Sequence, residues 1–589
     1  MSLVEVTDLT VEFGALRAVD GLSFRLAEGA ALGLVGESGS GKSTVASALL
    51  GLHRGTGAAV GGSVRVAGTD VQAASDEELR RLRGGRAAMV FQDPLSSLDP
   101  YYAIGDQIAE VYRVHTRVSR RTARARAVQV LDRVGIPDPV RRSRSRPHEF
   151  SGGMRQRALI AMALACEPDL LIADEPTTAL DVTVQAQILD LLHTLREDTG
   201  MGLLLVTHDV GVAAESVDEV LVMRHGRLVE HGPVEAVLAA PAQPYTRELL
   251  GAVPRVEARR AVGDDPRKPD VPRPGVPGPG VPGPGVPGPD VLRSDVPRSD
   301  ARQPGAGGPQ ADGLRPAGEP SGEVVLEAHG LRRDFGRGKR AFAAVDGVSL
   351  TVHRGQTLGV VGESGSGKTT LGRMLVGLLE PTAGEVRYEG RVSSGVNPTV
   401  QMVFQDPVSS LNPRRSVGES IADPLRARAR GVRGRDEARV RGRVTELLER
   451  VGLEAAHYDR YPHEFSGGQR QRVGIARALA ADPRVLVCDE PVSALDVTTQ
   501  AQVVALLGEL QRELGLALVF VAHDLAVVRQ VSDRVAVMRR GRVVEEGPAD
   551  EVYESPRDPY TRQLLAAVPA LDPAVAARRR AERREPALA

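Results

Sequence analysis

The stretch Gly36-Glu37-Ser38-Gly39-Ser40-Gly41-Lys42-Ser43 decides the fold, and it returns as Gly362-Glu363-Ser364-Gly365-Ser366-Gly367-Lys368-Thr369. Each copy fits the pattern G-x-x-x-x-G-K-[S/T], in which glycines let backbone N–H groups surround a phosphate and the next helix directs its positive end there. An apolar run precedes each copy (Ala31–Val35, Leu358–Val361), and a helical segment follows it (Thr44–Leu50, Thr370–Leu379). Strand, loop and helix in this order predict an α/β fold with a buried parallel sheet.

Lysine usage supports a phosphate site against the alternative of a chance glycine-rich turn. The chain has four lysines among 75 Lys plus Arg, and two of the four are Lys42 and Lys368. A compact ammonium fits a phosphate cradle better than a planar guanidinium does. The hydroxyls of Ser43 and Thr369 suit Mg²⁺, a hard cation that prefers oxygen ligands.

The composition is that of a globular protein with several domains. The 589 residues are 42% hydrophobic and 26% charged, with a net charge of −1, so no global basic field marks a nucleic-acid binder. Two cysteines, Cys166 and Cys488, exclude a disulfide framework and are expected in the core. Because no leader and no apolar run of about 20 residues is found, a cytoplasmic location is expected.

The rest of the first half carries polar groups at strand ends and helix starts. Phe13, after an alternating β-rich stretch, could stack on an adenine ring or pack beneath the strand. Residues 96–147 read as an inserted helical subdomain. Ser151-Gly152-Gly153 precedes a helix over 158–166 and forms an anion-receiving N-terminus. Buried strands end in Asp174-Glu175 and near His208, as in open α/β sheets that present ligand-binding groups.

The second half repeats these features in the same order, so two domains are expected, residues 1–254 and 323–570. The repeated features are Phe335, Gln405 for Gln92, Ser466-Gly467-Gly468-Gln469, Asp489-Glu490, Asp496 for Asp181, His523, and a second Pro-Tyr-Thr-Arg tail. Residues 255–322 form a disordered Pro/Gly-rich linker, because this composition cannot bury enough apolar surface. Residues 571–589 form a basic tail, read as a solvated helix end or, less favoured, a contact with anionic lipid.

These ordered motifs resemble the ATP-binding cassette (ABC) family of transporter ATPases. The stretches Gln92–Pro100 and Gln405–Pro413 and the two Pro-Tyr-Thr-Arg tails are similar to its oligopeptide, dipeptide and nickel importer branch. The resemblance implies two P-loop ATPase domains, each with a β-rich and an inserted helical subdomain. It implies ATP and Mg²⁺ as cofactors, and two sites that pair head to tail, each combining one cassette's phosphate loop with the other's Ser-Gly-Gly signature.

The resemblance also implies a role for each matching residue. Glu175 and Glu490 would activate the attacking water, with His208 and His523 contacting the γ-phosphate, and these four are the catalytic residues. The metal ligands would be Ser43, Gln92, Asp174, Thr369, Gln405 and Asp489. The nucleotide would contact Phe13, Gly36, Glu37, Ser38, Gly39, Ser40, Gly41, Lys42, Ser43, Thr44, Gln92, Ser151, Gly152, Gly153, Asp181, Phe335, Gly362, Glu363, Ser364, Gly365, Ser366, Gly367, Lys368, Thr369, Thr370, Gln405, Ser466, Gly467, Gly468, Gln469 and Asp496.

The function implied is ATP-driven import of peptides or related small solutes. The implied partners are two membrane-spanning permease subunits and an extracytoplasmic solute-binding protein, with no nucleic acid, and the chain would lie at the inner face of the cell membrane. Met154 departs from Gln469, which is expected to loosen a linker contact, and both sites are expected to hydrolyse ATP. Alternatives are a soluble twin-cassette factor acting on ribosomes and a DNA-repair cassette, although the latter needs zinc-binding cysteines.

Overall fold

The strand that enters the first phosphate loop, β3 (Ala31–Val35), is buried along its whole length in the computed structural model of the chain. Its alternate side chains face opposite sides of the sheet. Leu32 and Leu34 pack among the strands of a second, antiparallel sheet, whereas Ala31 and Val35 pack among helices. The phosphate loop therefore leaves from the middle layer of the cassette, where a strand must be apolar on both faces.

The structure describes residues 2–178, 180–256, 322–336, 341–406, 410–428, 437–493 and 495–584. Apart from its first two residues and its last, the predicted linker 255–322 lies outside the described residues, as do Ala179, Ala494 and the final five residues of the predicted tail. Both cassettes belong to one compact unit.

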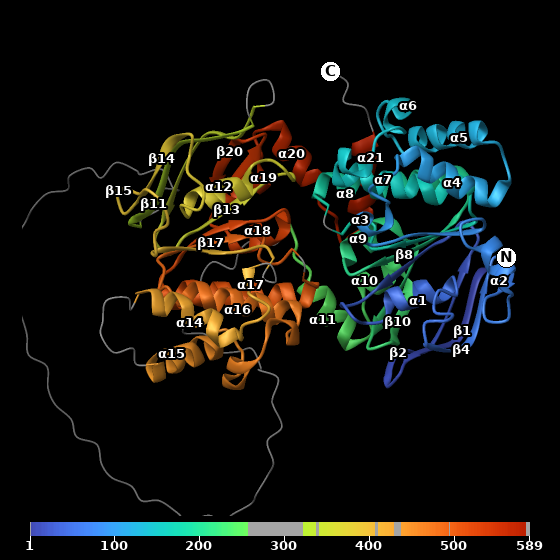
Figure 1. Cartoon of the computed structure of the whole chain (residues 1–589), viewed down its shortest axis with the longest axis horizontal. Helices are drawn as coiled ribbons and strands as arrows, with labels where there is room; N and C mark the ends of the chain where they lie inside the picture. The colour runs from blue at the N-terminus through green and yellow to red at the C-terminus, as the bar shows by residue number, and fades with distance from the viewer. Residues whose placement is uncertain are drawn as a thin grey trace, which may run out of the picture. The chain divides into compact units, whose positions relative to one another are not determined.

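The first cassette contains two sheets (Figure 1). The antiparallel sheet has the order β2 (Leu16–Ala27), β1 (Ser2–Phe13), β4 (Ala59–Val66) and β5 (Thr69–Asp70). The central sheet is parallel except at β10, with the order β10 (Arg227–Pro233), β9 (Glu219–Arg224), β3, β8 (Gly202–Thr207), β7 (Leu170–Asp174) and β6 (Ala87–Val90). The helices outside the helical insertion are α1 (Lys42–Leu49), α2 (Asp76–Leu82), α8 (Val182–Thr199), α9 (Val210–Ser216), α10 (Val234–Ala239) and α11 (Pro244–Ala252).

The second cassette repeats this topology. Its antiparallel sheet has the order β12 (Phe342–His353), β11 (Val324–Phe335), β14 (Ala383–Tyr388) and β15 (Arg391–Val392). Its central sheet has the order β16 (Val400–Val403), β17 (Val485–Asp489), β18 (Ala517–Val521), β13 (Thr357–Val361), β19 (Arg534–Arg539) and β20 (Arg542–Pro548). The helices outside its insertion are α12 (Lys368–Leu375), α17 (Val497–Leu514), α18 (Leu525–Val531), α19 (Ala549–Glu554), α20 (Pro559–Ala566) and α21 (Pro573–Arg584).

Each cassette carries the predicted helical insertion between its outermost parallel strand and the signature. In the first cassette the insertion consists of α3 (Pro94–Ser97), α4 (Ile104–Thr116), α5 (Arg120–Arg133), α6 (Pro139–Arg142) and η1 (Pro147–Glu149), followed by α7 (Gly152–Ala163) and η2 (Leu164–Cys166). In the second it consists of α14 (Val417–Arg428), α15 (Glu437–Arg450), η4 (Ala455–Asp459) and η5 (Pro462–Glu464), followed by α16 (Gly467–Leu479). In Figure 1, α4 lies beside α5, and α14 lies beside α15.

Four expectations need correction. The helix after the first signature begins at Gly152 rather than Ala158, because Ser151 caps it directly. The helix expected over 370–379 ends at Leu375, two residues before Gly377 with its left-handed φ of 74°. Cys488 is fully buried as expected, but Cys166 is only partly buried. In the tail, Arg580 donates to the backbone carbonyl oxygen of Glu215. At this residue the helix therefore packs against the protein and is not solvated.

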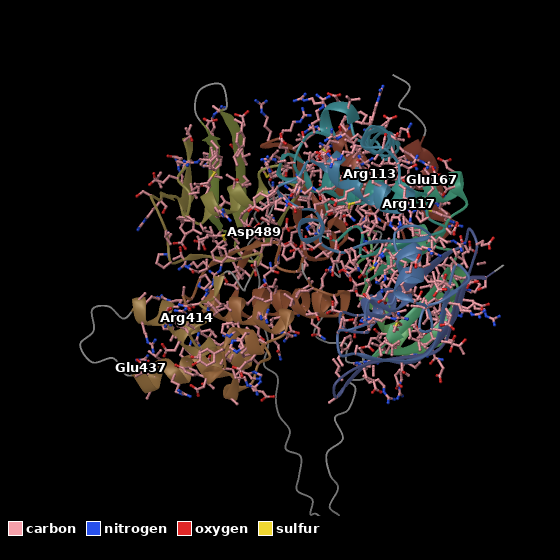
Figure 2. All side chains as sticks on the ribbon, turned by 45° about the vertical axis from the view of Figure 1, so that its right-hand side comes forward. Arg113, Arg117, Glu167, Arg414, Glu437 and Asp489 are labelled. Carbon is pink, nitrogen blue, oxygen red and sulfur yellow. The ribbon has the colours of Figure 1, made fainter. Side chains whose placement is uncertain are left out.

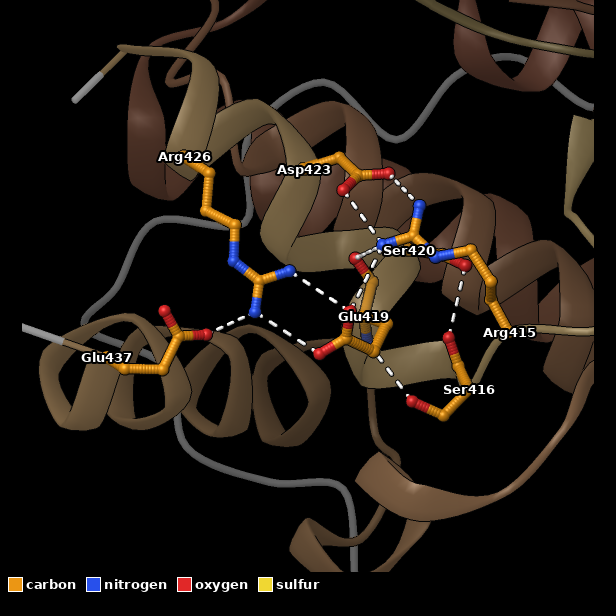
Figure 3. A network of polar contacts seen from close by, with 7 residues as sticks. All are labelled: Arg415, Ser416, Glu419, Ser420, Asp423, Arg426 and Glu437. Atoms are coloured by element: carbon orange, nitrogen blue, oxygen red, sulfur yellow. Dashed lines mark hydrogen bonds and ion pairs between the residues drawn. The ribbon is translucent and has the colours of Figure 1, made fainter. Parts of the chain in front are cut away.

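An ion-pair network joins α14 and α15 of the second helical insertion (Figure 3). Arg426 on α14 donates to both carboxylate oxygens of Glu419, at 3.1 and 3.2 Å, and to Glu437 at the start of α15. Arg415 pairs with Asp423 at 2.6 Å and with Glu419 at 3.1 Å. These hydrogen bonds hold the pKa of the Glu419 carboxyl below its ordinary value. Arg426 therefore fastens α15 to α14.

The first helical insertion lacks this network. Tyr102 stands where Arg415 stands, because the same offset of 313 that relates Gln92 to Gln405 relates these two positions. Asp106, which corresponds to Glu419, pairs instead with Arg124 on α5 at 2.9 Å. The corresponding helices, α4 with α5 and α14 with α15, are therefore joined by different ion pairs in the two cassettes.

Candidate functional site

Glycine is required at the end of each phosphate loop for two separate reasons. Gly41 and Gly367 have left-handed φ values of 98° and 106°, which L side chains rarely adopt. A Cβ atom at Gly41 would also lie 2.4 Å from the carbonyl oxygen of Ala18, and one at Gly367 would lie 2.2 Å from that of Ala344. The loops therefore press directly against the backbone of the antiparallel sheets.

The two loop lysines lie inside their own loops. The ammonium of Lys42 donates to the carbonyl oxygens of Gly36 and Glu37, both at 2.8 Å, and Lys368 donates to those of Gly362 and Glu363 at 2.6 and 2.8 Å. Burial lowers the pKa of both ammonium groups, and nearby carboxylates oppose this shift. Each loop therefore holds a buried cation where a phosphate would lie.

A hydroxyl and a carboxylate meet beside each loop. Ser43 donates to Asp174 at 3.0 Å, and Thr369 donates to Asp489, labelled in Figure 2, at 3.1 Å. Burial raises the pKa of both aspartates, and the hydroxyl hydrogen bonds oppose this shift. Among the described residues no cluster of three His, Cys, Asp or Glu side chains could hold a metal. The hydroxyl–carboxylate pair nevertheless fits Mg²⁺, which often takes one or two protein oxygens together with substrate phosphates.

The predicted catalytic glutamates have an unusual backbone conformation. Glu175 and Glu490 follow β7 and β17 directly and have left-handed φ values of 48° and 46°. Their amides donate to the carbonyl oxygens of Val206 and Val521 on the neighbouring strands, both at 2.9 Å. The adjacent strand therefore holds a backbone conformation that costs free energy in a non-glycine residue.

The carboxylate of Glu175 receives three polar groups. Gln92 Nε2 donates at 2.8 Å, Thr178 donates at 2.9 Å, and His208 Nδ1 lies at 3.1 Å. Thus Gln92, expected as a metal ligand, contacts the glutamate through its amide nitrogen. Sequence reasoning missed Thr178 as a functional residue, and its signal was a hydroxyl three residues after the glutamate in both halves.

The second site has the same arrangement with one difference. Gln405 Nε2 donates to Glu490 at 2.7 Å, and His523 Nδ1 lies 3.3 Å from the same carboxylate. Ser493, which corresponds to Thr178, donates to the backbone carbonyl oxygen of Glu490 at 3.2 Å. The glutamine, glutamate and histidine that the sequence predicted are therefore brought together in both cassettes.

Each glutamate and histidine pair shifts the pKa values of both partners. Burial would lower the pKa of His208 and His523, but the paired glutamates raise both above the ordinary value on balance. Burial would likewise raise the pKa of Glu175 and Glu490, but the histidines lower both on balance. The pairs are therefore charged between the lowered glutamate pKa and the raised histidine pKa, and their stabilisation is lost above or below that window.

Residues of the second phosphate loop line a cleft of about 660 Å³. A cleft of this volume suits a nucleotide. Phe335 lies in its lining and stacks with Phe342, with ring centroids 6.0 Å apart. In the first cassette Phe13 is 39% exposed and makes an edge contact with His53, so it does not pack beneath its strand. The predicted residues gathered in the second cleft are Phe335, Ser364, Gly365, Gly367, Lys368, Thr369, Thr370, Gln405, Glu490, His523 and, from the first cassette, Asp181.

The two signatures begin helices. The Ser151 hydroxyl accepts from the Met154 amide at 3.3 Å, and the Ser466 hydroxyl accepts from the Gln469 amide at the same distance. In the second cassette Gln469 Oε1 also accepts from the Ser466 amide at 3.0 Å, which completes a capping box. Met154 cannot form this bond. The substitution therefore removes a hydrogen bond at the start of the helix, in addition to the expected loosening of a linker contact.

The middle of each signature approaches the next helix closely. A Cβ atom at Gly153 would lie 2.4 Å from Val184 Cγ1, and one at Gly468 would lie 2.2 Å from Thr499 Cγ2. Asp181 and Asp496 cap those helices, accepting from the amides of Val184 at 3.0 Å and Thr499 at 2.9 Å. The signature and the aspartate are therefore fixed side by side within one cassette. The signature residues are not among those that line the cleft of the second loop.

Replacing Met154 with Gln is expected to stabilise the first cassette. A glutamine there could accept from the Ser151 amide, as Gln469 does from Ser466, and such a helix-start bond is worth about 0.5–1 kcal/mol. Thermal unfolding of Met154→Gln checks this expectation.

The matched control is Gln469→Met, which should lower stability by a similar amount. The prediction is contradicted if Met154→Gln lowers stability or if Gln469→Met leaves it unchanged.

Comparison with known proteins places these features in a family. A family model described as "ABC transporter" matches residues 19–178 and 345–493, and one described as "Oligopeptide/dipeptide transporter, C-terminal region" matches residues 229–280 and 544–589. The chain is 46% identical over 612 aligned residues to the oligopeptide transport ATP-binding protein OppD of Mycobacterium tuberculosis, covering 97% of this chain and 99% of that protein. It is 44% identical to the glutathione import ATP-binding protein GsiA of Escherichia coli, covering 95% of this chain and 87% of that protein.

Proposed function

The chain belongs to the ABC transporter family of ATP-hydrolysing proteins, and from that premise we propose that it energises the import of peptides or related small solutes through separate membrane subunits. The C-terminal region match carries this proposal, because it begins within the last part of each cassette and is described as that of oligopeptide and dipeptide transporters. Glutathione-like solutes and nickel belong to the same proposed range, and the relative GsiA supports the first of these.

The geometry supports a division of labour within each site. Ser43 with Asp174, and Thr369 with Asp489, would hold Mg²⁺, which when bound neutralises phosphate charge. Glu175 and Glu490 would orient or deprotonate the attacking water. The paired histidines hold the pKa of each carboxyl below its ordinary value against the effect of burial, so both groups are ionised acceptors at neutral pH. The histidines hold these carboxylates and would contact the transferred phosphoryl group.

Head-to-tail pairing of the two cassettes within one chain is part of the proposal. Leu180 and Asp181 of the first cassette line the cleft of the second phosphate loop. Burial lowers the pKa of both loop lysines, and a carboxylate of the other cassette opposes this shift in each case, Asp181 at Lys368 and Asp496 at Lys42. Head-to-tail pairing requires this reciprocal relation, because each cassette then turns its signature and the neighbouring aspartate toward the phosphate loop of the other cassette.

The proposed partners are two permease subunits and an extracytoplasmic solute-binding protein, with the chain cytoplasmic and peripheral at the inner membrane face. Across the described ranges, none of the helices combines the length and apolar character needed to span a bilayer. Tyr101 and Tyr102, at the start of the first helical insertion, are 80% and 62% exposed. Exposed neighbouring aromatics are typical of a protein-binding surface.

Replacing Tyr101 and Tyr102 with Ala is expected to weaken capture of membrane subunits. Affinity-tagged full-length chain would be purified from detergent-solubilised membranes of its source cells, and co-purifying multispanning proteins would be identified by mass spectrometry. Loss of two aromatic contacts should reduce capture at least about 10-fold, while the ATPase activity of the isolated chain stays within about 2-fold.

The control for this prediction is Leu16→Ala, which removes another exposed apolar side chain, on β2. It should leave capture unchanged. Recovery of ribosomes with no membrane protein would overturn import and favour the soluble twin-cassette alternative.

A further inference from the structure

The tyrosine of each Pro-Tyr-Thr-Arg sequence is buried next to a phosphate loop. Tyr245 and Tyr560 are 5% and 2% exposed, and each is the second residue of a helix that begins with proline, α11 or α20. As sequence motifs, these tails indicate only the branch of the family. Their position in the fold gives the tyrosines a second role.

In the second cassette the contact is a hydrogen bond to the loop itself. The backbone N–H of Glu363 donates to the hydroxyl of Tyr560 at 3.1 Å. The backbone carbonyl oxygen of the same residue accepts from Lys368 at 2.8 Å. Glu363, the second residue of the loop, is therefore held at its amide by the tyrosine and at its carbonyl by the loop lysine.

Surrounding groups fix the ring and its helix. The guanidinium of Arg539, at the end of β19, lies 4.6 Å from the ring centroid of Tyr560. The carboxylate of Glu545 on β20 accepts from the amides of Arg557 and Asp558 at 2.8 and 3.1 Å, which anchors the chain just before the helix. Two strands of the central sheet thus place the hydroxyl beside the loop.

The first cassette has the same construction. Arg224 lies 4.5 Å from the ring centroid of Tyr245, and Glu230 accepts from the amides of Ala242 and Gln243 at 2.7 and 3.2 Å. Burial raises the pKa of the Tyr245 phenol, and the backbone amide of Glu37 opposes this shift. The hydroxyl is buried beside that amide, although it does not reach the hydrogen-bond geometry seen at Tyr560.

We propose that Tyr560, and more weakly Tyr245, are positioning residues that hold the phosphate loop in the shape that receives a nucleotide. Burial raises the pKa of Tyr560 to about 12, so its hydroxyl stays protonated and neutral at physiological pH. A neutral hydroxyl can accept from the loop amide without placing a negative charge next to the phosphates. The inference rests on the ATPase site and not on the proposed import, so failure to capture membrane subunits would leave it intact.

Tyr560→Phe in the full-length chain tests the proposal. Phenylalanine keeps the ring and its contact with Arg539 and removes only the hydroxyl. The Michaelis constant for ATP should rise about 2- to 10-fold, as expected for the loss of one hydrogen bond, while kcat changes less than about 2-fold. Amide hydrogen exchange in the Gly362–Lys368 peptide should become faster. Tyr245→Phe should give a smaller change in the Michaelis constant.

The matched control is Tyr553→Phe in the neighbouring helix α19. Tyr553 is also buried, but its hydroxyl donates to the carbonyl oxygen of Leu525 at 2.6 Å, away from the loop. This variant should lower thermal stability and leave both the Michaelis constant and loop exchange unchanged. The proposal is overturned if Tyr560→Phe behaves in the same way as Tyr553→Phe. Should Tyr560→Phe not fold, rapid exchange of the Glu363 amide in the unaltered, nucleotide-free chain would overturn it as well.

Discussion

Replacing Glu175 and Glu490 together with Gln is expected to abolish ATP turnover and to preserve ATP binding. An amide cannot accept the proton of the attacking water, and general-base catalysis contributes typically about 10²–10⁴-fold. The side chain keeps an oxygen that can accept from Gln92 and Thr178, so the local geometry should survive. Phosphate release should fall at least about 100-fold, while titration with a fluorescent ATP analogue gives an unchanged dissociation constant.

The same double variant changes the charge of the histidines in a predictable direction. Glu175 raises the pKa of His208 against the lowering effect of burial, and Glu490 does so for His523. Without the glutamate charges, the lowering effect of burial is opposed less strongly, so the pKa values of both histidines should fall. Histidine resonances followed by NMR against pH can check this shift.

The single variants provide the control. Because both cassettes have the complete glutamine, glutamate and histidine arrangement, Glu175→Gln and Glu490→Gln should each reduce turnover. Undiminished hydrolysis in the double variant would refute the assignment of these bases. Full activity of one single variant would instead show that only one site turns over.

The second large effect is expected from combining Lys42→Ala with a bulky change in one signature or the other. If the cassettes pair head to tail, Lys42 shares a site with Ser466, and Lys368 shares the other site with Ser151. Lys42→Ala with Ser466→Arg should then damage one site twice and leave the other intact. Lys42→Ala with Ser151→Arg should damage both sites.

Nucleotide retention distinguishes these two variants. With a slowly hydrolysed ATP analogue and rapid gel filtration, the chain carrying Lys42→Ala and Ser466→Arg should retain one nucleotide, and the chain carrying Ser151→Arg instead should retain none. Each serine change also removes a helix cap worth about 1 kcal/mol, so the two variants are matched in stability cost. Equal retention by the two variants would contradict head-to-tail pairing within one chain.

The fold was predictable because its signals are local. The apolar strands before Gly36 and Gly362, the polar strand ends at Asp174 and Asp489, and the repeated order of motifs all follow from residues near one another in sequence. Burial on both faces of β3 and β13 then follows from their apolar composition. The strand ends that carry Glu175 and His208 were also local signals, because neighbouring parallel strands present their carboxyl ends at one edge. The grouping of Gln92 with them was implied by the resemblance to the ABC family.

Contacts between distant segments were not predictable in this way. The Tyr560 hydroxyl meets Glu363 across 197 positions, and no periodicity or spacing relates the two. The direction of the Gln92 amide is a similar case, since a glutamine at a strand end could face either a metal or a carboxylate. The start of α7 at Gly152 was missed because glycines usually disfavour helices, and here the Ser151 cap and close packing against α8 outweigh that tendency.

The left-handed backbone at Glu175 and Glu490 limits which residues can replace them over evolutionary time. Valine, isoleucine and threonine are disfavoured there, because a branched Cβ fits this conformation poorly. Asparagine, aspartate and glycine adopt it at a lower free-energy cost. A descendant of this gene that lost one hydrolytic site would therefore be expected to carry a short polar residue or glycine after the strand, and such a residue would mark an inactivated copy.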